Sequence, residues 1–213
     1  MDIETVKIDN KITPYLICAY NGTDYISSYA DKSLNQTALF TTFINQLLIF
    51  FTSSKTLTVY AHNLSKFDGI FLFNQLLEFG IVKPRYHNQK LILFKVKLTI
   101  PGFKNKTIIF KDSMLPLSLR ILCAAFSIES SKGYFPFNLN NILYKGVFPK
   151  FEYWTGISLS EYGLLLKEYT GVEWNFKNEA IKYCKLDCQS LHEILTKFNE
   201  LIFNNFKINI KYV

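Results

Sequence analysis

Four carboxylates in three separate segments of the sequence have the spacing of a divalent-cation site. Asp2 and Glu4 stand at i and i+2, so on a β-strand both side chains point to the same face. Asp68 follows a predicted strand-to-helix turn, and Asp187 lies on a long predicted helix. Oxygen ligands without His or Cys favour Mg²⁺ or Mn²⁺. Two such ions about 4 Å apart assist in-line attack on a phosphodiester.

A tyrosine accompanies the last of these acids. Tyr183 and Asp187 stand at i and i+4, so they share a face of the predicted helix, next to its apolar stripe. From the residues alone, ordinary alternatives stay open. Asp2 and Glu4 fit an exposed edge strand, Asp68 fits a helix N-cap, and Tyr183 with Asp187 fits a solvated surface.

The segment from Tyr60 to Asp68 predicts a turn between a strand and a helix. Open sheets bind ligands at such turns, at the carboxyl ends of their strands. Asn63 and Phe67 offer an amide and an aromatic ring, which can hold a nucleotide by hydrogen bonding and stacking. Tyr60 and His62 fit the same role, and equally fit packing at a strand end.

The surrounding pattern predicts a single α/β domain over residues 1–213. Its strands and helices alternate along the chain, which is typical of a mixed sheet flanked by helices. The predicted strands are 2–6, 12–20, 24–29 and 56–62, with a hairpin over 90–111. The predicted helices are 36–51, 70–79, 115–126, 158–169 and 178–206, with an aromatic loop over 127–155.

Composition narrows the class of protein. Hydrophobic residues make up 49% and charged residues 19%, which excludes a disordered chain. The longest apolar run, 37–52, contains polar residues and is too short to span a bilayer, so we expect no membrane partner. The N-terminus has no signal-peptide pattern, and the four cysteines fit reduced, intracellular thiols.

Charge and amino-acid composition give two further indications, one of a partner and one of the genome that encodes the chain. The net charge is +7, and the segment from Arg85 to Lys111 holds seven basic residues and no acidic one. This surplus indicates a polyanion partner or, equally, a solvated hairpin edge. The 20 Phe and 13 Tyr against 9 Gly and 6 Pro indicate an A/T-rich genome, as in mitochondria and their plasmids.

Three motifs resemble those of the DEDDy 3′–5′ exonucleases. They are Asp2-Ile3-Glu4-Thr5, the segment from Asn63 to Asp68, and the segment from Tyr183 to Asp187. The stretch from Tyr60 to Gly69 is more similar still to the protein-primed family B DNA polymerases of phages and linear mitochondrial plasmids.

Two further segments resemble motifs of that subgroup. Ser118-Leu119-Arg120-Ile121-Leu122 is similar to its (S/T)Lx₂h motif, and Lys132-Gly133-Tyr134-Phe135 is similar to its Kx₂h motif. The resemblance covers nearly the whole chain, with the motifs in the same order.

The resemblance implies a ribonuclease H-like fold and the proofreading exonuclease of such a polymerase. It implies two metal ions on Asp2, Glu4, Asp68 and Asp187, with Tyr183 orienting water and Lys132 offsetting phosphate charge. It also implies contacts to the 3′ end of single-stranded DNA and, as partners, a polymerase domain or a terminal protein. The implied DNA contacts are Thr5, Tyr60, His62, Asn63, Phe67, Ser118 and Leu119.

The chain departs from the family pattern at both ends. It stops soon after Asp187, so we expect the polymerase palm, fingers and thumb to be absent and no synthesis by this chain alone. It starts one residue before Asp2, so we expect the α-amino group to compete with Mg²⁺. The alternatives are an inactive remnant that only binds single-stranded DNA, or a stand-alone ribonuclease of the same superfamily.

Overall fold

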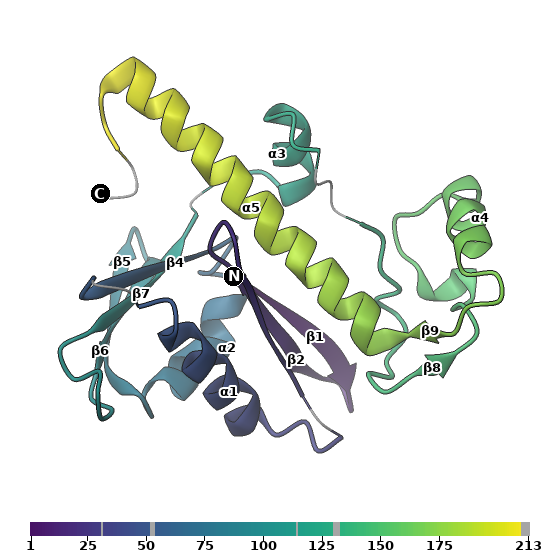
Figure 1. Cartoon of the computed structure of the whole chain (residues 1–213), viewed down its shortest axis with the longest axis horizontal. Helices are drawn as coiled ribbons and strands as arrows, with labels where there is room; N and C mark the ends of the chain where they lie inside the picture. The colour runs from purple at the N-terminus through teal and green to yellow at the C-terminus, as the bar shows by residue number, and fades with distance from the viewer. Residues whose placement is uncertain (31, 52–53, 114, 130–132, 210–213) are drawn as a thin grey trace.

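A computed structural model describes residues 1–30, 32–51, 54–113, 115–129 and 133–209 (Figure 1). The chain begins with a three-stranded antiparallel sheet in the order β1-β2-β3. Asp9 and Asn10 have φ of 48° and 61°, the positive values that a two-residue hairpin turn requires. The strands are β1 (Asp2–Ile8), β2 (Lys11–Tyr20) and β3 (Tyr25–Tyr29).

A second sheet has four strands in the order β4-β7-β6-β5 and is mixed. Strands β4 and β7 are parallel, whereas the β7–β6 and β6–β5 pairs are antiparallel. The expected hairpin over 90–111 corresponds to β6 and β7. The strands are β4 (Thr56–Ala61), β5 (Gly80–His87), β6 (Lys90–Leu98) and β7 (Thr107–Asp112).

Strand β5 does not figure among the predicted elements, and it begins at Gly80, directly after the predicted helix 70–79. Its residues are mostly exposed and include Pro84, so no apolar alternation marks the strand. Proline is tolerated because β5 is an edge strand of its sheet. A Cβ on Gly80 would lie 2.1 Å from the carbonyl oxygen of Lys97, so close approach of two strands explains this glycine.

The helices agree with the predicted ones except at their ends. Helix α3 begins at Leu119 rather than at residue 115, because the Ser118 hydroxyl caps it at the Ile121 N–H. The region 127–155 contains a short 3₁₀ helix and β8 as well as loop. The elements are α1 (Gln36–Leu48), α2 (Asp68–Leu76), α3 (Leu119–Ala125), β8 (Lys145–Gly146), the 3₁₀ helix Phe151–Tyr153, α4 (Leu159–Glu168), β9 (Trp174–Asn175) and α5 (Phe176–Phe206).

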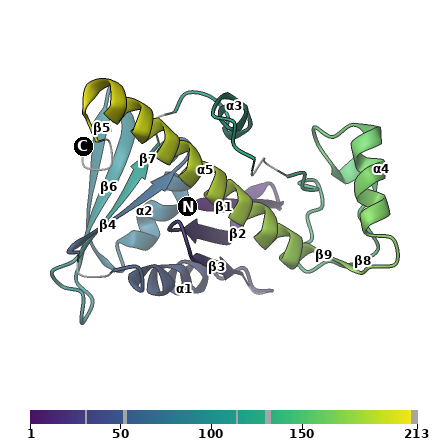
Figure 2. The same ribbon diagram turned by 45° about the horizontal axis from the view of Figure 1, so that its top comes forward.

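The helices cover the sheets on both sides. Helix α5 crosses one face of the β1-β2-β3 sheet and α1 lies against the opposite face (Figure 2). The continuous burial of β2 from Tyr15 to Ala19 follows from this double cover. The expected α/β class, a ribonuclease H-like mixed sheet flanked by helices, is therefore confirmed.

The two sheets meet at the start of the chain. The α-amino nitrogen of Met1 donates a hydrogen bond of 2.5 Å to the carbonyl oxygen of Tyr60. The beginning of β1 therefore lies beside the carboxyl end of β4. None of the described helices has the length and apolar character needed to cross a bilayer.

Candidate metal centre

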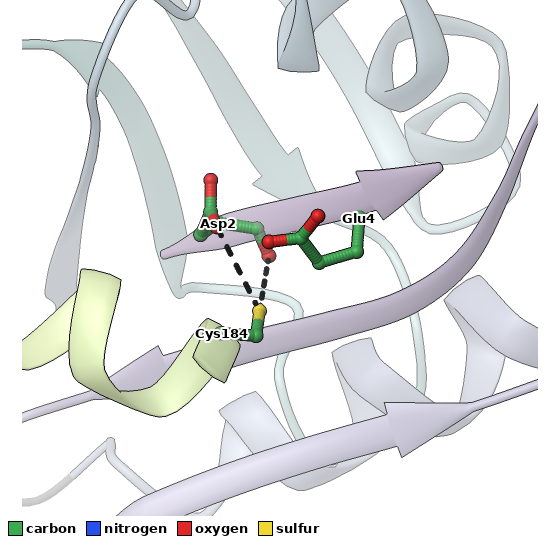
Figure 3. Close-up of side chains that lie close together, drawn as sticks. All are labelled: Asp2, Glu4 and Cys184. Carbon is green, nitrogen blue, oxygen red and sulfur yellow. Dashed lines mark hydrogen bonds between the residues drawn. The ribbon is translucent and has the colours of Figure 1, made fainter. Parts of the chain in front are cut away.

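Strand β1 carries the first two carboxylates of the site. Asp2 is partly buried and Glu4 is 9% exposed, and the two carboxylates lie on one face of β1, as their spacing predicts (Figure 3). Cys184 of α5 lies with them: one ligand atom from each of these three residues lies within 4.8 Å of the other two. The compact group therefore contains a thiol, where the sequence predicted oxygen ligands only.

A β-bulge directly follows Glu4. The β1–β2 register shifts between Glu4 and Thr5, and Tyr15 is the additional residue on β2. Bulges redirect neighbouring side chains and are frequent next to active sites. Tyr15 is buried at this point, and burial followed by the nearby charge of Glu4 raises its pKa.

Asp68 approaches the same place from α2. Its side chain is 2% exposed, and the N-cap of α2 is Phe67, so the interpretation of Asp68 as the cap is wrong. Burial and then the charge of Asp2 raise the pKa of the Asp68 carboxyl well above its usual value, while the Met1 amine lowers it. Among the described residues, Asp68 Oδ1 has no hydrogen-bond partner.

Helix α5 supplies Tyr183 and Asp187, which are 4% and 6% exposed. The alternative of a solvated surface pair is therefore wrong. The ring of Tyr183 packs against Phe135 and Phe137, each with a centroid separation of 5.5 Å. Burial, then the charges of Asp187 and of the β1 carboxylates, raise the pKa of Tyr183, and a hydrogen bond with Asp187 adds to this.

These residues fit a divalent cation. Three elements bring together carboxylates that are largely withdrawn from water, and like charges in such a place resist ionisation unless a cation compensates them. The Asp68 oxygen without a partner and the raised Asp68 pKa are the marks of that missing compensation. The residues that would hold the cation are Asp2, Glu4, Asp68 and Asp187.

The turn between β4 and α2 is shaped by its own backbone. Asn63 has φ of 64°, and its carbonyl oxygen accepts from the N–H groups of Lys66 and Phe67 at 3.1 and 3.2 Å. The Gly69 N–H donates to the Leu64 carbonyl oxygen at 2.8 Å. A Cβ on Gly69 would lie 2.7 Å from that oxygen, so the turn requires glycine here.

The predicted DNA-contacting residues of this region differ in their exposure. Asn63 is exposed, and Phe67 is half-buried with its ring 5.4 Å from Phe71. Nδ1 of His62 lies 3.1 Å from the Ser113 hydroxyl, within hydrogen-bond distance.

Two other predicted contacts are half-buried on the neighbouring strands. Tyr60 on β4 lies under the ammonium group of Lys111, which is 5.7 Å from its ring centroid. Thr5 lies on β1 directly after the bulge.

The remaining predicted residues lie further along the chain. Ser118 is exposed and caps α3, whereas Leu119 is 7% exposed and packs in the cluster that joins α3 to α5. The side chain of Leu119 is thus turned into the protein. Lys132 lies outside the described residues, but Phe135 of the same motif packs on Tyr183.

The basic segment from Arg85 to Lys111 is divided between two ends of its sheet. Because β4 and β7 are parallel, the β6–β7 turn with Lys104 lies where β4 begins. The β5–β6 turn lies where β4 ends, and a Cβ on Gly69 would be 3.1 Å from Leu91 of β6. The carboxylates therefore lie nearer to the β5–β6 turn than to the β6–β7 turn with Lys104.

Two residues of the site were not among the predicted ones. Cys184 precedes Asp187 by three positions, a helical spacing that places these two residues on one face of α5. Asp112 ends β7, is 6% exposed, and accepts a 2.9 Å hydrogen bond from the Ser65 N–H. It holds the turn that carries Asp68.

The fold and the site define an α/β domain of the ribonuclease H-like class with a buried carboxylate cluster. Residues 51–213 match the family model described as DNA polymerase type B, organellar and viral, and the chain belongs to this family.

Individual relatives agree with this membership. The chain is 32% identical to a probable DNA polymerase of Neurospora intermedia over 95% of its length, and 31% identical to one of Ascobolus immersus over 100%. It spans 22% and 19% of those two relatives, about a fifth of their length.

A solved structure shares the fold. Phi29 DNA polymerase complexed with primer-template DNA superimposes with a TM-score of 0.54 and 15% sequence identity. The match covers 94% of this chain and 31% of that one. At this identity the similarity is evidence for the fold.

Proposed function

We propose that the chain is a metal-dependent 3′–5′ exonuclease, the proofreading domain of a protein-primed family B DNA polymerase. The observation that carries the proposal is the convergence of acids from β1, α2 and α5 beside the buried hydroxyl of Tyr183. The substrate is the 3′ end of single-stranded DNA, and the products are nucleoside 5′-monophosphates.

Each residue of the cluster has a role in this proposal. Asp2, Glu4, Asp68 and Asp187 hold two Mg²⁺ or Mn²⁺ ions, which supply charge neutralisation and water activation when bound. Tyr183, fixed by Phe135 and Phe137, orients the attacking water through its hydroxyl. Lys132 offsets charge near the scissile phosphate.

The substrate strand is held by the surface around the β4–α2 turn. Asn63 and Phe67 offer hydrogen bonding and stacking there, and Thr5, Tyr60 and His62 flank them. Ser118 contributes an exposed hydroxyl, whereas the buried Leu119 supports its position through packing on α5.

The cellular setting is part of the proposal. The fungal relatives and the amino-acid composition, which is rich in residues with A/T-rich codons, favour a gene of a mitochondrion or of its plasmids. Residues 1–213 form one proofreading domain, and template-directed synthesis requires a polymerase domain beyond these residues. A terminal protein is a further partner.

Hydrolysis of end-labelled single-stranded DNA tests the proposal. The chain should shorten a 5′-labelled strand stepwise in Mg²⁺ or Mn²⁺ and stop in chelator. Asp187→Asn and Asp2→Ala/Glu4→Ala should lower the rate by at least a hundredfold, because each removes a ligand of the metal pair. Glu200→Gln is the matched control, since Glu200 is exposed on the same helix, about 20 Å further along.

Three results would contradict the proposal. Equal rates of hydrolysis in the parent and in Asp187→Asn would show that the metal centre takes no part in the reaction. Degradation of RNA alone would indicate the stand-alone ribonuclease. Metal-independent binding of single strands without hydrolysis would indicate the inactive remnant.

A further inference from the structure

The thiol of Cys184 lies beside the two carboxylates of β1. Its Sγ is 3.8 Å from Oδ2 of Asp2 and 3.7 Å from the backbone oxygen of the same residue (Figure 3). The thiol is 0% exposed, and Glu4 completes the group of mutually close ligand atoms. A role as an apolar core residue does not require this contact with the Asp2 carboxylate.

A second observation concerns Asp68, a further acid of the cluster. Asp68 is 2% exposed, and its Oδ1 has no hydrogen-bond partner in the described part of the chain. A carboxylate in this position is stabilised by a cation placed between it and Asp2.

The spacing of the thiol and the acid suits a thiophilic ion. Zinc binds thiolate sulfur at about 2.3 Å and carboxylate oxygen at about 2.0–2.2 Å, so a tetrahedral ion separates the two atoms by about 3.6 Å. The separation in the protein is 3.8 Å. Sulfur is a poor ligand for Mg²⁺ and a good one for Zn²⁺ and Cd²⁺.

We propose that Asp2, Glu4 and Cys184 form a binding site for a thiophilic divalent cation, Zn²⁺ or Cd²⁺, within the carboxylate cluster. On binding, the thiol proton passes to solvent and the thiolate coordinates the ion. Such an ion takes the carboxylates that the proposed exonuclease needs for Mg²⁺, and would therefore inhibit it. Only this last consequence rests on the proposed function.

Cadmium titration of the reduced full chain tests the site without any measurement of hydrolysis. The ultraviolet charge-transfer absorption of a thiolate–Cd²⁺ bond should appear and saturate at one ion per chain. Cys184→Ser should abolish it, and Cys184→Ala provides a second variant should the serine perturb folding. Cys123→Ser should retain it, because Cys123 is buried in the separate α3–α5 cluster.

Two further measurements decide which ligands take part. The double variant Asp2→Asn/Glu4→Gln should bind Cd²⁺ at least tenfold more weakly, and zinc-edge X-ray absorption of the parent should give one sulfur ligand. Absorption that survives in both Cys184 variants would overturn the proposal. So would two or three sulfur ligands, or unchanged affinity in the double variant, because either would place the ion on Cys18, Cys184 and Cys188 alone.

Failure of the metal site and failure of the exonuclease are distinguishable. A chain that binds Cd²⁺ as described but does not hydrolyse DNA in Mg²⁺ would retain this site and lose the proposed function. A chain that hydrolyses DNA but shows no charge-transfer absorption would retain the proposed function and lose this metal site.

Discussion

The α-amino nitrogen of Met1 donates a 2.5 Å hydrogen bond to the carbonyl oxygen of Tyr60, and this bond joins the start of β1 to the end of β4. It brings Asp2 to the turn that carries Asp68, although 66 positions separate these acids in the sequence. The charge of the amine also lowers the pKa of Asp68. The competition of this amine with Mg²⁺ stays a prediction.

The first prediction concerns pH and Asp68. Burial and Asp2 raise the pKa of this carboxyl in the folded chain above its unfolded value of about 4. As pH rises from about 4, the unfolded chain loses this proton first, so the free energy of unfolding falls until the folded pKa is passed. Each pKa unit between the folded and the unfolded value lowers the free energy of unfolding by about 1.4 kcal/mol.

Asp68→Asn removes this dependence. In chelator, the stability of the variant relative to the parent should increase from pH 4 to pH 7, measured by urea unfolding. Added Mg²⁺ should stabilise the parent at pH 7, by about 2.7 kcal/mol at a hundred times its Kd, and the variant less. A difference between the two proteins that does not change with pH would contradict the burial argument.

The second prediction separates the hydroxyl of Tyr183 from its ring. Tyr183→Phe keeps the packing on Phe135 and Phe137, so the melting temperature should change little. Hydrolysis should slow by roughly 10²–10⁴-fold, because the water loses an orienting partner. Tyr162→Phe is the matched control: it removes a 3.1 Å hydrogen bond that the Tyr162 hydroxyl on α4 donates to the Pro149 carbonyl oxygen, and it should leave the rate unchanged.

The third prediction divides the basic segment. Arg85 and Lys90 are exposed near the end of β4, whereas Lys104 lies at the far turn and Lys106 is 4.8 Å from the Phe51 ring. Arg85→Gln/Lys90→Gln should lower the slope of log K against log salt for single-stranded DNA. The slope should fall by about 0.7 for each phosphate that the variant no longer neutralises.

Lys104→Gln/Lys106→Gln is the comparison, with the same change in charge. Its slope should equal that of the parent. A smaller slope in this variant alone would mean that the single-stranded DNA binds along the opposite end of the sheet, away from the carboxylates.

The fourth prediction concerns a cavity of about 330 Å³ beside Met1. Its lining includes Ala19 and Tyr20 of β2, residues 57–60 of β4, and His192 of α5. The β1–β2 pairing stops at Asp2 and Cys18. An extended segment before Met1 would therefore lengthen β1 and pair with the residues of β2 that follow Cys18.

An Ile-Thr-Val extension before Met1 should therefore raise the melting temperature relative to a Gly-Ser-Gly extension. Each β-branched side chain that becomes fully buried contributes about 1.5–3 kcal/mol, and each kcal/mol is worth about 2–4 °C in a chain of this size. Calorimetry of the two extended proteins is the measurement. Equal melting temperatures would show that the extension does not enter the cavity.

Local patterns in the sequence predicted most of the secondary-structure elements and proposed the acids and the tyrosine of the candidate site. Period-two and helical patterns predicted β1, β2, α1 and α5, because one buried face repeats along each element. The i and i+4 spacing of Tyr183 and Asp187 placed both on one helical face, as the structure has them. The exposed edge strand β5 escaped prediction, since pairing with β6 rather than its own apolar pattern makes it a strand.

The way in which these residues meet depends on the packing of the whole chain. The position of Cys184 beside Asp2 depends on how α5 crosses β1, and no local pattern encodes a contact across 182 positions. The burial of Asp68 against Asp2 likewise depends on the junction of two sheets at Met1 and Tyr60. Desolvation and the field of neighbouring charges are set by packing, so the electrostatics of the site emerge only with the fold.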